Sequence, residues 1–192
     1  MQLIELHERA LRQATAVIAE VGSADLARPT PCAGWDLHAL LAHCIGQNHG
    51  FADAVSGPDA PASAFAPQPP EPGAWAASAE RVHAAFRAAQ PDRRVLLVEL
   101  GPDVRLPVAT VLGFHLLDTV VHTWDVATAL EQPFRPDDDM LAVVAAGAQQ
   151  VPAGPARTGP GAAFGPVLTV DGDDPWITTL AQLGRRPLLL KA

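Results

Sequence analysis

Apolar residues recur at helical spacing along most of this chain. Between Leu3 and Val21 they fall three or four positions apart, with Glu, Arg and His between them, which predicts a first helix. The same spacing continues in three further long segments, at about residues 37–55, 74–89 and 108–130. Shorter patterns predict a fifth helix over Asp137–Gln149 and a terminal helix that begins near Asp174–Pro175 and ends at Gly184. The pattern therefore predicts an all-α bundle.

Proline and glycine interrupt this pattern at defined places. Six prolines between Gly57 and Gly73 exclude a helix and predict a long loop over one end of the bundle, of the kind that often serves as a lid. The stretch 95–107 offers two short extended pieces around Gly101–Pro102, which predict a small hairpin. Residues 151–166 are rich in Pro and Gly and predict irregular chain. We expect one domain over 1–192, with a core bundle over about 1–131 and a C-terminal extension over about 132–192.

Composition narrows the classes of protein that this chain could belong to. It has 192 residues, of which 48% are hydrophobic and 18% charged, and no apolar run approaches the length of a membrane span. Its start reads as an amphipathic helix and not as a signal peptide, so we expect a cytoplasmic protein without a membrane partner. The net charge of -8, without a basic patch, argues against nucleic acid as a partner. Cys32 and Cys44 lack the spacing of a zinc knuckle and are expected as free thiols.

The segment 108–130 holds the most informative polar pattern. Four residues fall on one helix face, at spacings of three, four and three: His115, Asp118, His122 and Asp125. An ordinary solvated stripe is the alternative interpretation, but such stripes consist mainly of Lys, Glu, Arg and Gln. His and Asp are metal ligands, and Asp118 and His122 are spaced so that one helix presents both to a single ion.

A third metal ligand is expected from the segment 37–55, which contains His38, His43 and His49. Periodicity alone does not choose among these histidines. Small residues lie around His43 on the predicted helix and would leave room for an ion: Ala39, Ala42, Gly46 and Gly50.

Three stretches of sequence resemble one known family. They are TPCAGWDLHALLAHCIGQNHGF at 30–51, DTVVHTWDVATAL at 118–130 and LAQLGRRP at 180–187. They are similar to the DinB-like superfamily of metal-binding proteins, in the branch of the mycothiol-dependent maleylpyruvate isomerase N-terminal domain and its uncharacterised actinobacterial relatives. The resemblance implies an up-down-down-up four-helix bundle with extra C-terminal helices.

The same resemblance selects the metal ligands. A Gly-Trp pair precedes a helix whose LxxH histidine is the first ligand, which corresponds to His43, and a helix ending in His-x-Trp-Asp supplies Asp118 and His122. The isomerase carries Glu where this chain has Asp118, which is one methylene shorter and is therefore expected to bind the ion less directly or through water. We expect His49, His115 and Asp125 to flank the ligands. For Asp125 there are two alternatives: it forms a hydrogen bond with a ligand histidine, or it faces solvent.

Two histidines and one carboxylate leave open positions on zinc or nickel, which is typical of a catalytic site. The resemblance implies that a thiol cofactor of the mycothiol type binds there and attacks an electrophilic substrate, as in a thiol S-transferase or isomerase. The alternatives are a metal- or ligand-binding module without catalysis that forms a homodimer, and a relict site that binds no metal. Cys32 lies just before a predicted helix, where it could be a reactive thiol or an ordinary free thiol. Trp35 and Trp124 are expected to pack in the core.

Overall fold

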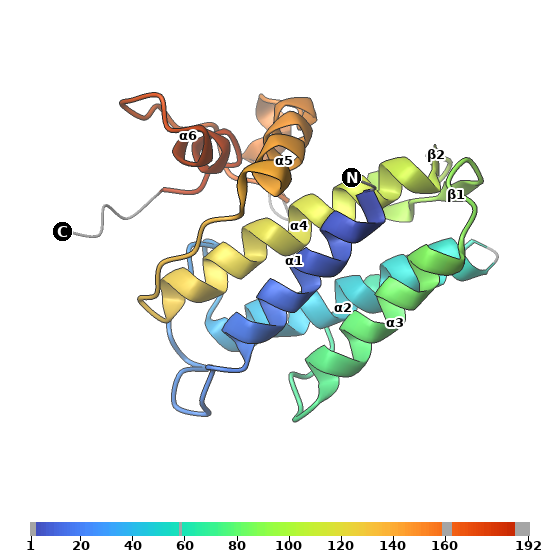
Figure 1. Ribbon diagram of the computed structural model, residues 1–192, viewed down its shortest axis with the longest axis horizontal. Coiled ribbons are helices and arrows are strands. Elements are labelled where there is room, and N and C mark those ends of the chain that lie inside the picture. Colours follow the sequence, from blue (N-terminus) through green and yellow to red (C-terminus); the bar gives the residue numbers. More distant parts are fainter. Residues whose placement is uncertain (1–2, 58, 159–162, 187–192) are drawn as a thin grey trace.

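The computed structural model describes residues 3–57, 59–158 and 163–186, and four long helices form its main body (Figure 1). All four lie where the spacing of apolar residues predicts them: α1 (Leu3–Ile18), α2 (Leu37–Ser56), α3 (Ala74–Ala88) and α4 (Val108–Ala129). The first helix ends three residues before Val21. Asp36 caps α2 by accepting a hydrogen bond from the backbone N–H of Ala39. The prediction of an all-α bundle is confirmed.

The direction of the helices explains the long connection between α2 and α3. In Figure 1, α1 and α4 run from the end that carries the N-terminus toward the opposite end, and α2 and α3 run back. The order is therefore up-down-down-up, as expected. Because α2 and α3 are parallel neighbours, the chain between them must return along the bundle, and the proline-rich segment supplies that length.

This segment is docked on α2 by a short 3₁₀ helix, η1 (Ala62–Phe65). A Cβ at Gly46 would lie 2.4 Å from the carbonyl oxygen of Ala66, and one at Gly50 would lie 2.3 Å from the ring of Phe65. The two glycines thus allow the close approach of this segment. The space at these two glycines is filled by the segment and not left for an ion, so the expectation is wrong for Gly46 and Gly50. Residue 58, within the predicted loop, lies outside the described residues.

A two-stranded hairpin connects α3 with α4. Strands β1 (Arg94–Leu96) and β2 (Arg105–Pro107) pair antiparallel, with Arg94 opposite Pro107, and a 3₁₀ turn, η2 (Val98–Leu100), lies between them. The predicted hairpin is confirmed. Val95 and Leu97 are buried in the core, which fixes the hairpin on the bundle at the start of α4.

The C-terminal extension packs on the outer side of α4. Helix α5 (Asp138–Gln150) contacts α4, and α6 (Pro175–Gln182) contacts α5. Between them lies a short 3₁₀ turn, η3 (Pro155–Arg157), in a segment that is otherwise irregular as predicted, although 159–162 lie outside the described residues. Within the described part of the chain, no helix combines the length and the apolar character needed to cross a membrane.

Helix α4 is covered on nearly all sides, by α1, α2 and α5. Its polar residues are therefore buried: His115 is 1% exposed, His122 8% and Asp125 0%. The interpretation of this stripe as an ordinary solvated face is wrong. Polar groups without water around them need partners inside the protein, and the identity of those partners defines the site.

Candidate metal centre

Three side chains from two helices converge between α2 and α4. The ligand atoms of His43, Asp118 and His122 all lie within 4.8 Å of one another. Nε2 of His122 is 3.3 Å from Oδ1 of Asp118, one turn earlier on the same helix. The ring of His43 meets that of His122 edge-on, with their centroids 5.1 Å apart. The structure thus brings together the three residues that the sequence points to.

Asp125 fixes the orientation of the His122 ring. Its Oδ2 lies 2.9 Å from Nδ1 of His122, and because a carboxylate can only accept, Nδ1 donates the proton. Nε2 is left facing Asp118 and the space beside His43. A carboxylate behind an imidazole in this way is typical of metal-bound histidines. Asp125 is fully buried, so the alternative that it faces solvent is wrong.

Arg185, from the C-terminal extension, balances the charge of Asp125. Its Nη2 lies 3.1 Å from Oδ2 of Asp125, and its Nε lies 3.4 Å from Oδ1. The chain reaches this position through a tight turn at Gly184, where φ is +75° and a Cβ would meet Gly165 at 2.6 Å. The role of Arg185 could not be predicted, because nothing in the local pattern of residues 180–187 shows that this side chain turns into the bundle.

Cys32 completes a second group, with His122 and Asp125. The thiol donates to Oδ2 of Asp125 at 3.1 Å and accepts from Nη2 of Arg185 at 3.3 Å, and its sulfur is 3.9 Å from Nδ1 of His122. These atoms are close enough to hold an ion. However, Asp125 already accepts from His122 and Arg185, and a dication placed there would be repelled by the guanidinium. Asp118 pairs with His122 and not with Arg185, so the group of His43, Asp118 and His122 is the better candidate.

Two of the three converging residues are in the protonation state of a metal ligand, and the third, His122, must first release a proton. Burial lowers the pKa of His43 to about 4, against the opposing influence of Asp118, so its imidazole is neutral and can donate a lone pair. Burial would raise the pKa of Asp118, but the neighbouring His122 outweighs it and holds that pKa well below its usual value. Burial likewise opposes a charge on His122, yet Asp118 raises its pKa well above the ordinary range. In protein without metal, His122 is therefore protonated on both ring nitrogens, and this cation lies between the carboxylates of Asp118 and Asp125.

Two other residues expected near the ligands belong to different networks. His49 accepts a hydrogen bond from Arg81 of α3 at 3.1 Å. His115 lies 2.8 Å from His7 of α1 through its Nδ1 and 3.0 Å from Oδ1 of Asn48 through its Nε2. Since the amide oxygen only accepts, the proton of His115 is on Nε2, and His7 donates to Nδ1. Neither histidine is part of the two groups that could hold an ion.

The two tryptophans differ in burial. Trp124 is 8% exposed and packs in the core, as predicted. Trp35 is 37% exposed, and its ring centroid lies 4.8 Å from that of His43, so the prediction that it packs in the core is wrong. The cause is a turn in which Gly34, two residues before the cap of α2, adopts a φ of +82°. The turn places Trp35 on the outer side of the candidate ligands.

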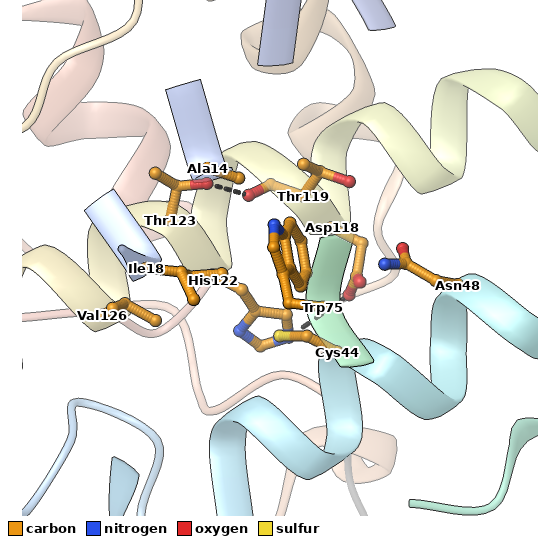
Figure 2. Close-up of a pocket in the computed structure, with 10 residues that line it drawn as sticks. All are labelled: Ala14, Ile18, Cys44, Asn48, Trp75, Asp118, Thr119, His122, Thr123 and Val126. Carbon is orange, nitrogen blue, oxygen red and sulfur yellow. Dashed lines mark hydrogen bonds and ion pairs between the residues drawn. The ribbon is translucent and has the colours of Figure 1, made fainter. Parts of the chain in front are cut away.

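On the inner side of the candidate ligands lies a small cavity (Figure 2). It has a volume of about 10 Å³, close to the space of one water molecule, and it lies between the four helices of the bundle. Asp118 and His122 border it together with Cys44, Asn48 and Trp75. Burial raises the pKa of the Cys44 thiol to about 12, so this sulfur stays protonated. The cavity has room for a water molecule beside the ligands and not for a cofactor.

Comparison with known proteins identifies the family of this chain. Residues 7–127 match the family described as the mycothiol maleylpyruvate isomerase N-terminal domain, and this range includes all three candidate ligands. Two Mycobacterium tuberculosis proteins described as uncharacterized, MT0763 of strain CDC 1551 / Oshkosh and Rv0738 of strain ATCC 25618 / H37Rv, are each 30% identical over 166 residues. These alignments cover 85% of this chain and 86% of each relative.

Solved structures of a related protein have the same fold as this chain. The crystal structure of the mycothiol-dependent maleylpyruvate isomerase superposes with a TM-score of 0.60 at 15% identity, and a histidine-to-alanine mutant of that isomerase gives the same values. The superposition covers 76% of this chain and 66% of the isomerase, so the chain spans about two thirds of that protein's length. At this identity the likeness shows the fold. The chain belongs, on the match over residues 7–127, to the mycothiol maleylpyruvate isomerase N-terminal domain family.

Proposed function

We propose that this protein binds one divalent transition-metal ion, zinc or nickel, through His43, Asp118 and His122, and that it activates the thiol of a small cofactor of the mycothiol type. The observation that carries the proposal is the convergence of two imidazoles and one carboxylate within 4.8 Å. The reaction is the attack of this thiol on an electrophilic substrate, as in a thiol S-transferase or a thiol-dependent isomerase.

The donor set fits such an ion. His43 is neutral at neutral pH and Asp118 is ionised. Asp125 holds Nδ1 of His122, so Nε2 is the nitrogen that would bind the ion, once the metal displaces its proton. Three protein ligands leave at least one position open, because zinc in catalytic sites keeps a place for water or substrate. His43 and Asp118 are half-buried and Trp35, whose ring contacts His43, is exposed, so the thiol would approach the ligands from this side.

A dication held by these residues would lower the pKa of a coordinated thiol, so that sulfur attacks as a thiolate at neutral pH. The thiol proton passes to solvent. In a transfer reaction a sulfur–carbon bond forms and the leaving group departs with the bonding electrons. In an isomerisation the sulfur adds to a carbon–carbon double bond, the resulting single bond rotates, and the sulfur leaves again. Asp125 keeps the His122 ring in place throughout.

Metal analysis is the first test. Protein purified without chelators is expected to contain about one equivalent of a transition metal, and His122→Ala is expected to contain almost none. His49→Ala removes a histidine from the same helix as His43 and should retain the metal. Wild-type protein with a negligible metal content, which also fails to bind added Zn²⁺ or Ni²⁺ in a titration, would contradict the proposal.

The thiol step needs a separate measurement. Metal-loaded protein with mycothiol and 1-chloro-2,4-dinitrobenzene should form the conjugate faster than the uncatalysed reaction, and His122→Ala should lose this acceleration. Equal rates for the two proteins would contradict the thiol function and would leave metal binding intact.

The small size of the inner cavity favours a second candidate, a metal-binding module without catalysis that forms a homodimer. At about 10 Å³, the cavity beside Asp118 and His122 admits no thiol cofactor. This candidate predicts that metal raises the melting temperature while mycothiol has no effect on metal-loaded protein. An additional shift on adding mycothiol would favour the thiol function.

A further inference from the structure

Glu99 lies outside the candidate ligand set but close to it. This residue is part of η2, in the hairpin, and its Oε1 accepts a hydrogen bond from Nε2 of Gln47 at 2.9 Å. Gln47 is 6% exposed and follows His43 by one turn of α2, so the two side chains leave the helix on the same face. The hydrogen bond therefore holds the carboxylate of Glu99 beside the face that carries His43.

The electrostatic surroundings of Glu99 are unfavourable for an additional negative charge. Burial raises the pKa of its carboxyl, the hydrogen bond from Gln47 lowers it, and the charge of Asp118 raises it again. The two carboxylates thus repel each other. Among the described residues, the guanidinium of Arg185 lowers the pKa values of His43 and Asp125. It donates hydrogen bonds to Asp125 and Cys32. It is not free to receive a substrate carboxylate.

Apolar side chains gather around the same outer side. In the described part of the chain the large hydrophobic residues that are exposed are Trp35, Leu100, Phe114 and Val167. Two of the four lie next to the candidate ligands. The ring of Trp35 contacts that of His43, and Phe114 precedes Asp118 by one turn on α4. The exposed side of the site therefore combines aromatic surface with a negative charge.

We propose that Glu99 is a specificity-determining residue, which favours uncharged apolar electrophiles and disfavours electrophiles that carry a carboxylate. The inference rests on the proposed thiol function and deepens it. With a dication bound, the two negative charges of Asp118 and Glu99 would cancel the two positive charges of the ion. The positive charge of Arg185 cancels the negative charge of Asp125. A thiolate then makes the site negative overall. An anionic substrate meets repulsion there, and a neutral aromatic substrate meets Trp35 and Phe114.

A binding experiment tests the charge preference without turnover. The probes are N-phenyl-1-naphthylamine, which is neutral, and 8-anilinonaphthalene-1-sulfonate, which has the same rings and a negative charge. Fluorescence titration of the wild-type protein should show tighter binding of the neutral probe. In Glu99→Gln the ratio of the two dissociation constants should fall at least about fivefold, through tighter binding of the sulfonate.

Glu80→Gln is the matched control for this experiment. Glu80 borders an open groove of about 590 Å³ between α1 and α3, where apolar probes could also bind. The control should leave the ratio unchanged. A ratio that responds to Glu80→Gln and not to Glu99→Gln would overturn the proposal, as would no response to either substitution.

Turnover separates this inference from the proposed function. The substrates are 1-chloro-2,4-dinitrobenzene and its anionic analogue 4-chloro-3,5-dinitrobenzoate, each with mycothiol and metal-loaded protein. In both reactions sulfur bonds to the ring carbon, chloride leaves with the bonding electrons, and the thiol proton goes to the buffer. Wild-type protein should prefer the neutral substrate, and Glu99→Gln should reduce that preference at least about fivefold. An unchanged preference in Glu99→Gln would refute the role of Glu99, whereas no catalysis of either substrate would refute the thiol function.

Discussion

The imidazole of His122 is held from behind by Asp125, with 2.9 Å between Nδ1 and Oδ2. This contact determines which nitrogen faces the proposed metal. Asp125→Asn replaces the acceptor by an amide that can also donate, and it removes the charge that favours the required tautomer. We expect the affinity for Zn²⁺ to fall about 10- to 100-fold, measured by competition with a chromophoric chelator. Asp53→Asn removes a surface carboxylate paired with Arg81 and should leave the affinity unchanged. Equal affinities for both variants would show that Asp125 does not support the site.

The ion pair between Arg185 and Asp125 is buried, so its loss should be costly. Arg185→Met leaves a carboxylate without its counter-charge and is expected to lower the free energy of unfolding by about 3–5 kcal/mol in urea denaturation. Arg186→Met changes the exposed neighbouring residue and should have little effect. The double variant Asp125→Asn/Arg185→Met removes both charges and should recover part of the loss. A double variant less stable than the sum of the two single changes would contradict this account.

The buried pair of His7 and His115 should make the protein sensitive to acid. Burial is the main cause that lowers their pKa values, to about 2 and about 4 respectively. Below pH 6.5 the unfolded chain therefore binds more protons than the folded one, and stability that is fully present above pH 6.5 is lost as the pH falls toward 4. Each histidine contributes a slope of up to about 1.4 kcal/mol per pH unit.

His7→Gln tests this slope, because the amide nitrogen can still donate to His115 but does not titrate. In metal-free protein, the dependence of the unfolding free energy on pH between 6.5 and 4.5 should become shallower than in the wild type. His38→Gln, at an exposed position, should keep the wild-type slope. If His7→Gln shows the wild-type slope as well, protonation of the buried pair does not cause the acid sensitivity.

The docking of the proline-rich segment on α2 depends on Gly50. Gly50→Ala would place a methyl group within 2.3 Å of the Phe65 ring, so either the ring or the segment must move. We expect a loss of about 1–3 kcal/mol in the free energy of unfolding, measured by thermal or urea denaturation. Gly113→Ala, inside α4 with no atom within 4 Å of the new methyl group, is the matched control and should be neutral or slightly stabilising. Equal effects of the two substitutions would contradict the packing.

Sequence predicts the local features of this protein and misses its long-range ones. The helices, the hairpin and the caps at Asp36, Asp137 and Asp174 follow from spacing and from side chains close in sequence. The pairing of Asp118 with His122 follows from the helical repeat. The contact of Asp125 with His122 is one of the two alternatives offered by the sequence. Its other partners could not be predicted, because Cys32 and Arg185 approach it from 93 and 60 positions away. Gly46 and Gly50 show the same limit, since sequence reveals that space is available but not which atoms fill it.

The turn at Gly184 has a consequence for how the chain folds. It delivers the positive charge that Asp125 requires near the C-terminal end of α4, although Asp125 belongs to the bundle and Arg185 to the extension. A bundle that folded before the extension docked would carry an uncompensated carboxylate in its interior. The two parts should therefore unfold in a single cooperative transition, and the candidate metal centre should acquire its final geometry only when the last described turn is in place.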